Sequence, residues 1–200
     1  MPLAPETRVP TGLLLLTGGR GRRLGGPKHD QPHPEGGTWG GHLVRVFQEA
    51  LPGGPVQLLG QPLPDFPGLP LLEDAGQGPA AALEAWAAHP CASPLRWWVA
   101  ACDQVRWTPK ALQAWLEAAT AADPLAERWV LARDGDHLQY LGSLLASRLL
   151  PTLAAAPARR LRDLLQVLPT QVLDWPGECW LDVDTPEEGQ AWGGSLKDLP

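Results

Sequence analysis

The chain has 200 residues, 44% of them hydrophobic, and this length and composition suit one domain with a sizeable core. Its net charge of −6 argues against a protein that binds DNA or RNA, since such proteins carry a basic face and usually a basic total. The sequence has no apolar run of about 18 residues and no signal-peptide pattern at its start, so we expect no membrane span and no signal peptide.

Residues 1–10 are predicted to be a short disordered lead, and residues 11–200 to form one domain. Apolar runs bounded by turn residues predict strands. In chain order these are Gly12–Leu16, Val56–Leu59, Leu71–Leu72, Arg96–Ala101, Trp129–Ala132, Thr170–Leu173 and Trp180–Val183. Helical spacing and capping residues predict helices over His42–Leu51, from Pro79 onward, over Pro109–Ala122 and Ala158–Leu168, and from Thr185 onward. A further helix is predicted over Leu141–Ala156, with an interruption at Pro151.

Strands and helices alternate along most of this order, which is typical of an α/β protein. The fold class predicted is therefore a three-layer α/β/α sandwich around a mainly parallel sheet. Ligands of such sheets bind at the carboxyl ends of the strands. In this sequence a basic, glycine-rich loop follows the first predicted strand, and acidic residues follow several later strands.

The loop after the first strand reads TGGRGRRLGGPK. Its glycines, including Gly18, Gly19 and Gly21, allow backbone N–H groups to approach phosphate oxygens. Its cations are Arg20, Arg22, Arg23 and Lys28. The loop is neither a Walker A motif nor a dinucleotide fingerprint, because the positions that those motifs require are missing. We interpret it as a phosphate-binding loop, the alternative being a mobile turn with solvated arginines.

Acidic residues at the later strand ends are candidate ligands of a metal ion. Asp103 follows a hydrophobic strand and is well placed to hold Mg²⁺ against a triphosphate, although it could also cap a helix. Asp182 and Asp184 alternate around one residue and should point to the same side of their strand. One of them could be a second metal ligand, contact a substrate, or cap the last helix.

Other reactive side chains give weaker signals. The five histidines (His29, His33, His42, His89 and His137) have no metal-ligand spacing, so each is predicted to be exposed or structural. The three cysteines are an odd number without a CxxC spacing, which favours a reducing, cytoplasmic location. Cys102 adjoins the predicted site, but we interpret it as a small buried residue rather than a nucleophile.

Four segments together resemble the nucleotidyltransferases related to molybdenum cofactor guanylyltransferase. LLLLTGGRGRRLGGPK resembles the family's loop LAGGxGxRMGGxxK, and LEDAGQGPAAAL resembles its acidic stretch with the following GPLAG. AACDQV resembles its CDxP motif, and LDVDTPEE its terminal NxNTPEE motif. The matches fall in the family's order over about 180 residues, and it is their conjunction that indicates this family.

The resemblance implies the fold of nucleotide-diphospho-sugar transferases and transfer of GMP from GTP to molybdopterin with Mg²⁺. It implies that nucleotide is bound by Leu16, Thr17, Gly18, Gly19, Gly21, Lys28, Asp74 and Asp103. Asp103 would hold the metal, and Lys28, Arg20 and Arg23 would offset phosphate charge. Asp182 and Asp184 would lie near the pterin, which a separate protein could deliver.

Several positions depart from the family pattern. The proline of CDxP is replaced in Cys102-Asp103-Gln104-Val105, and the second glycine of GPLAG is missing after Gly78. Thr17 replaces the usual alanine, and polar residues follow Lys28. The Asp-Val-Asp sequence also occurs in related cytidylyltransferases. A transferase that uses CTP or another acceptor, and a nucleotide-binding adaptor without turnover, therefore remain alternatives.

Overall fold

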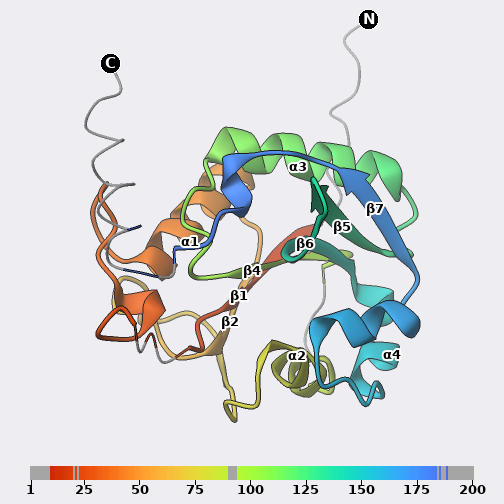
Figure 1. The fold of residues 1–200 in the computed structure, drawn as a ribbon, viewed down its shortest axis with the longest axis horizontal. Helices are drawn as coiled ribbons and strands as arrows, with labels where there is room; N and C mark the ends of the chain where they lie inside the picture. Colours follow the sequence, from red (N-terminus) through yellow and green to blue (C-terminus); the bar gives the residue numbers. More distant parts are fainter. Residues whose placement is uncertain are drawn as a thin grey trace, which may run out of the picture.

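A computed structural model describes residues 10–19, 21, 23–89, 94–183, 185 and 188. Its centre is a seven-stranded sheet in the order β3-β2-β1-β4-β6-β5-β7 (Figure 1). The strands are β1 Thr11–Leu16, β2 Val56–Gly60, β3 Leu71–Glu73, β4 Arg96–Ala101, β5 Trp129–Asp134, β6 His137–Ala146 and β7 Thr170–Asp174. The predicted lead lies outside the described residues except for Pro10.

The sheet is mainly parallel, as predicted. Strand β1 pairs in parallel with both β2 and β4, and β2–β3 and β5–β7 are also parallel pairs. Only β6 runs antiparallel to its neighbours, β4 and β5, among the described strands. The carboxyl ends of β1, β2, β3 and β4 therefore meet at one edge of the sheet.

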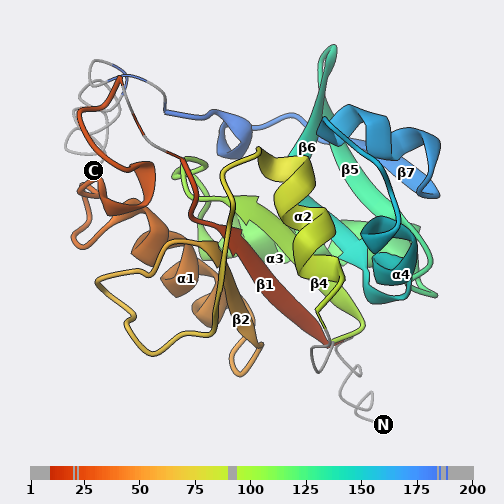
Figure 2. The same cartoon turned by 90° about the horizontal axis from the view of Figure 1, so that it is seen from below.

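Helices cover both faces of the sheet, which confirms the three-layer prediction. Helices α1 (Trp39–Ala50) and α3 (Pro109–Ala122) lie on one face, and α2 (Pro79–Ala87) and α4 (Leu150–Ala154) on the other (Figures 1 and 2). The described 3-10 helices are η1 Lys28–Asp30, η2 Ser147–Leu149, η3 Leu161–Gln166 and η4 Glu178–Trp180. Helix α3 begins as predicted, since the Thr108 hydroxyl accepts a hydrogen bond from the N–H of Ala111.

The four leucines of β1 divide between two cores, because successive side chains of a strand point to opposite faces. Leu13 and Leu15 pack in the core under α1 and α3, whereas Leu14 and Leu16 pack in the core under α2 and α4. All four are less than 9% exposed. A strand buried on both faces explains the continuous apolar run.

Three predicted elements are wrong. The helix predicted over Leu141–Ala156 is instead three elements in turn, the end of β6, the 3-10 helix η2 and the short α4. Gly142 has a φ of +81°, and a Cβ there would lie 2.5 Å from the Trp180 ring, so its backbone and its packing both suit glycine. A continuous buried apolar run does not by itself distinguish a strand from a helix.

The other two errors are at the C-terminal side. Within Ala158–Leu168 the chain forms only the 3-10 helix η3. The strand predicted over Trp180–Val183 is absent from this described stretch: η4 ends at Trp180 and an irregular segment follows. The predicted cap at Thr185 is consistent with two reciprocal hydrogen bonds to Glu188, while the helix beyond it lies outside the described residues. None of the described helices is long and apolar enough to cross a bilayer.

Candidate functional site

The ends of β1, β2, β3 and β4 form the candidate site. Leu16 ends β1 and leads into the glycine-rich loop, Gly60 ends β2, and Asp74 and Asp103 follow β3 and β4 closely. The parallel strands are in register at this edge, where Leu16 lies opposite both Leu59 and Ala101. Residues far apart in the sequence therefore gather here.

Lys28 and Asp103 form an ion pair that bridges two of these segments. The Nζ atom of Lys28 is 2.6 Å from Oδ2 of Asp103, although the residues are 75 positions apart. Their side chains are only 20% and 17% exposed. The structure thus brings together the cation and the carboxylate that the sequence singled out for the phosphates and the metal.

The turn that carries Asp103 is stabilised by two residues that sequence analysis did not select. The buried Gln104 side chain accepts a hydrogen bond from the N–H of Ala101 and donates one to the carbonyl of Leu141. The N–H of Val183 donates to the carbonyl of Asp103 at 3.3 Å. Gln104 occupies the position before the missing proline, and its two hydrogen bonds brace the turn without that proline.

Thr17 is completely buried, and its hydroxyl connects β1 to the segment after β2. The hydroxyl donates to the carbonyl of Gln61 at 2.6 Å and accepts from the N–H of Gln61 at 2.7 Å. The side chain is thus engaged within the protein, and its hydroxyl is not presented to a ligand. Its position beside Gly18 shapes the entry to the loop.

Replacing Thr17 by Ala is expected to destabilise the fold by about 1–3 kcal/mol, because the fully buried hydroxyl and both of its hydrogen bonds to the Gln61 backbone are lost. Thr152→Ala, which removes an exposed threonine in α4, provides the control. Urea unfolding measures the difference between the two variants. Equal free energies of unfolding for both variants would contradict the assigned role of the Thr17 hydroxyl.

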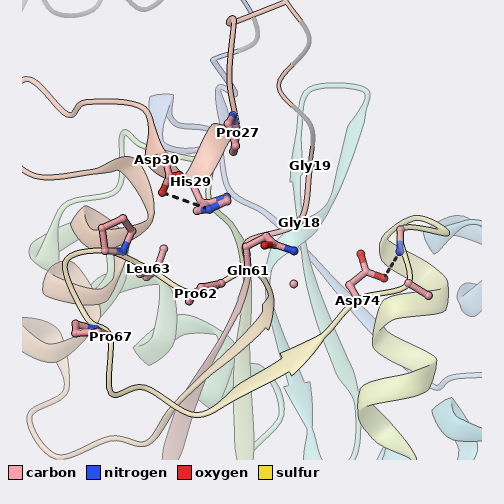
Figure 3. Close-up of a pocket in the computed structure, with 14 residues that line it drawn as sticks. Gly18, Gly19, Pro27, His29, Asp30, Gln61, Pro62, Leu63, Pro67 and Asp74 are labelled. Atoms are coloured by element: carbon pink, nitrogen blue, oxygen red, sulfur yellow. Dashed lines mark hydrogen bonds and ion pairs between the residues drawn. The ribbon is translucent and has the colours of Figure 1, made fainter.

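Two cavities lie beside the glycine-rich loop. The larger has a volume of about 700 Å³ and extends from Gly18 and Asp74 toward Gln61 and His29 (Figure 3). The second, of about 610 Å³, extends from the same two residues toward the N-terminal end of α2. Asp74 lines both cavities, and its Oδ1 accepts a hydrogen bond from the N–H of Gly76, which fixes the carboxylate (Figure 3).

The remaining predicted residues are placed as follows. Leu16, Gly19 and Gly21 line the second cavity, Arg23 is exposed, and Asp182 is an exposed neighbour of the buried Val183. Arg20 and Asp184 lie outside the described residues. Cys102 is buried as predicted, and burial raises the pKa of its thiol, which keeps it protonated and unsuited to nucleophilic attack.

Gly60 and Gln61 line the larger cavity but were not selected from the sequence. Gly60 has a φ of +127°, and a Cβ there would lie 2.5 Å from the backbone nitrogen of Gly18. The close approach of these two glycines joins the ends of β1 and β2. The only sequence signal for Gly60 and Gln61 was their position directly after the strand predicted over Val56–Leu59.

The fold and the site define a class of protein. A glycine-rich loop, two cavities and a lysine–carboxylate pair at the carboxyl edge of a mainly parallel sheet are suited to bind the phosphates of a nucleotide. Residues 13–172 match the family model of the MobA-like NTP transferase domain, and the chain belongs to this family. It is therefore a nucleotidyltransferase.

Known proteins support this assignment. A molybdenum cofactor guanylyltransferase of Pseudomonas putida (strain GB-1) is 31% identical over 180 residues, which cover 82% of this chain and 85% of the relative. A role in molybdenum cofactor biosynthesis is thereby supported.

Solved structures share the fold. A molybdopterin-guanine dinucleotide biosynthesis protein A of Archaeoglobus fulgidus has a TM-score of 0.69 at 16% identity, covering 94% of this chain and 100% of its own. A Mycobacterium tuberculosis H37Rv protein in complex with manganese has a TM-score of 0.63 at 19% identity, covering 94% and 98%. The 2-C-methyl-D-erythritol 4-phosphate cytidylyltransferase of Thermus thermophilus has a TM-score of 0.60 at 15% identity, covering 93% and 98%.

Proposed function

We propose that this nucleotidyltransferase transfers GMP from GTP to molybdopterin in the cytoplasm, forming the guanine dinucleotide cofactor and releasing pyrophosphate. The choice of GTP and molybdopterin is supported by the Pseudomonas putida relative, which this chain matches over most of its length. The transfer chemistry is supported chiefly by the Lys28–Asp103 pair beside the glycine-rich loop. The two free cysteines among the described residues, Cys102 and Cys179, suit a reducing compartment.

In the proposed reaction a terminal phosphate oxygen of molybdopterin attacks the α-phosphorus of GTP, and the bond from that phosphorus to pyrophosphate breaks. Lys28, Arg23 and Arg20 offset the negative charge that develops. Asp74 contacts the guanosine, while Asp182 and Asp184 contact the pterin substrate. The positive end of the α2 dipole, at the second cavity, also favours phosphate groups. Positioning and electrostatics therefore supply most of the rate acceleration.

The residues at Asp103 fit a hard divalent cation. Mg²⁺ prefers one or two carboxylates, with phosphate oxygens and water as its other ligands. Asp103 offers a largely buried carboxylate, and the hydrogen bond between Val183 and the Asp103 carbonyl brings the segment that carries Asp182 beside it. Asp103 would hold Mg²⁺, which supplies charge stabilisation at the phosphates when bound. The manganese complex of a protein with this fold is consistent with a divalent ion.

The Lys28–Asp103 pair makes metal binding depend on nucleotide. In the nucleotide-free chain the ammonium of Lys28 already neutralises the carboxylate, so a cation must displace it. A triphosphate offers Lys28 a new anionic partner and offers the metal additional oxygen ligands. Mg²⁺ is therefore expected to enter the site together with the nucleotide.

In nucleotide-free protein, Lys28→Met is expected to strengthen Mg²⁺ binding about tenfold, because the competing charge is removed. Isothermal titration of Mg²⁺ measures the change, and Lys110→Met, at an exposed lysine of α3, is the control. If Lys28→Met and wild type bind Mg²⁺ with the same affinity, Lys28 does not restrict access of the ion to Asp103.

The decisive experiment combines nucleotides and acceptors. Purified protein is incubated with GTP or CTP, with and without molybdopterin, and pyrophosphate release is measured. Release from GTP that depends on Mg²⁺ and molybdopterin supports the proposal. Preference for CTP overturns the assignment of GTP, and pyrophosphate release that does not require molybdopterin overturns the assignment of the acceptor. Nucleotide binding in an equilibrium titration, without turnover, supports the adaptor alternative.

A further inference from the structure

A second cluster of ligating side chains lies at the start of α1, outside the two cavities. One donor atom each from His33, Glu35 and His42 lies within 4.8 Å of the others. His33 and Glu35 belong to a tight turn, in which the N–H of His33 donates to the carbonyl of Gly37. Helix α1, capped by the side chain of Thr38, brings His42 back to this turn.

The segment after Asp103 orients both imidazole rings. Nε2 of His42 lies 3.0 Å from the carbonyl oxygen of Trp107, and Nε2 of His33 lies 3.5 Å from that of Val105. A ring nitrogen that faces a carbonyl carries the proton, so each neutral ring keeps its lone pair on Nδ1. A ring N–H donated to a backbone carbonyl is typical of histidines that bind a metal through the other nitrogen.

The Nδ1 atoms of His33 and His42 both lie near Glu35. Nδ1 of His42 is 3.7 Å from Oε2 of Glu35, and Nδ1 of His33 accepts a hydrogen bond from the N–H of Glu35 at 3.2 Å. The two rings stack with their centroids 3.7 Å apart. Nitrogen lone pairs and a carboxylate therefore lie close together. The charged neighbours are Arg45, on α1, and Asp65, in the loop after β2.

The two histidines are buried and Glu35 is exposed, an arrangement that suits a bound ion. His33 and His42 are 5% and 8% exposed, whereas the Glu35 side chain is 62% exposed. The buried rings are held by their surroundings, and the exposed carboxylate leaves the cluster open to an ion from solvent.

We infer that His33, His42 and Glu35 form a binding site for a borderline divalent transition-metal ion, with Zn²⁺ as the best match. Two imidazole nitrogens and one carboxylate oxygen are a donor set that Zn²⁺ and Co²⁺ accept and that Mg²⁺ does not favour. Three protein ligands leave a fourth position for water on the exposed side. Binding replaces the Glu35 N–H bond to His33 and tilts the stacked rings so that their lone pairs converge.

This site is separate from the Asp103 carboxylate, but it connects the two segments that carry Lys28 and Asp103. His33 follows Lys28 by five residues, and the carbonyl groups that orient the rings belong to Val105 and Trp107, just after Asp103. An ion bound here would fix these segments relative to each other. Its expected effect is to stabilise the fold rather than to take part in phosphoryl chemistry.

The test uses chelator-treated full-length protein and Co²⁺, whose visible absorption reports coordination by histidine. The variants are Glu35→Gln, at an exposed position, and His42→Gln, which keeps an amide donor for the Trp107 carbonyl. His137→Gln, at an exposed histidine at the start of β6, is the matched control. Circular dichroism shows whether each variant is folded, and Zn²⁺ affinity is measured by competition.

We expect one Co²⁺ per chain with absorption typical of tetrahedral coordination. Each ligand variant should weaken Zn²⁺ binding about 100-fold and abolish the rise in melting temperature that Zn²⁺ causes in wild type. The control should bind as wild type does. No binding of Co²⁺ at millimolar concentration, or full binding in folded Glu35→Gln and His42→Gln proteins, would overturn the inference.

Discussion

Asp103→Asn is expected to reduce pyrophosphate release about 100-fold or more while the protein stays folded. The substitution keeps the size of the side chain but removes the charge that holds Lys28 at 2.6 Å and that would hold Mg²⁺. Because the side chain lies at the edge of the site rather than in a core, the melting temperature should change by only a few degrees. Steady-state release from GTP and thermal unfolding measure the two effects.

The matched control for this loss is Asp174→Asn. Asp174 also forms an ion pair, with Arg133 at 2.7 Å, but it ends β7 at the border of the sheet away from the cavities. Its replacement should leave turnover unchanged. Wild-type turnover in Asp103→Asn would exclude Asp103 as the metal ligand, and equal losses in both variants would point to a general effect of charge.

Gly60→Ala is expected to reduce both stability and nucleotide affinity. A Cβ at this position would lie 2.5 Å from the Gly18 nitrogen and 3.1 Å from the Thr17 carbonyl carbon, and a φ of +127° strains any residue other than glycine. Strain and overpacking together should cost about 2–5 kcal/mol. Displacement of Gly18 should weaken GTP binding about tenfold or more, because Gly18 lines both cavities.

The variant Gly53→Ala is a control that introduces backbone strain without a steric contact. Gly53 also has a positive φ, +81°, but a Cβ there would have no neighbour within 4 Å. This control should lose about 1–3 kcal/mol of stability and no affinity for GTP. Urea midpoints and equilibrium titration with GTP measure both variants. Unchanged affinity in folded Gly60→Ala protein would show that the β1–β2 contact does not shape the nucleotide site.

Local signals in the sequence explain which parts of the fold could be predicted. Helix α3 and strand β4 have the bounds that the sequence predicts, since a threonine cap with proline marks the first and polar residues bound the second. Strand β6 could not be predicted in the same way. Its second half is buried, and its strand partners, β4 and β5, are defined only by the folded sheet.

The residues of the candidate site likewise include some that the sequence predicts and some that it does not. Lys28 and Asp103 each follow a recognisable strand, so their chemistry could be predicted and the structure pairs them. Gln61 and Gln104 are ordinary polar residues whose importance depends on non-local partners. The proximity of His33 and His42 was missed because a turn and a helix cap, rather than a regular spacing, bring them together.

The hydrogen bond from Val183 to Asp103 has a consequence for how the enzyme matures. Val183 is fully buried beside Trp39 and Val105, so a late segment of the chain completes the surroundings of an early one. Contacts of such large sequence separation form only after much of the chain entropy has been lost. A partly synthesised chain that ends before Val183 would contain the glycine-rich loop but would lack the hydrogen bond to the Asp103 carbonyl. Competence for catalysis is therefore expected to arise late, after the sheet has assembled.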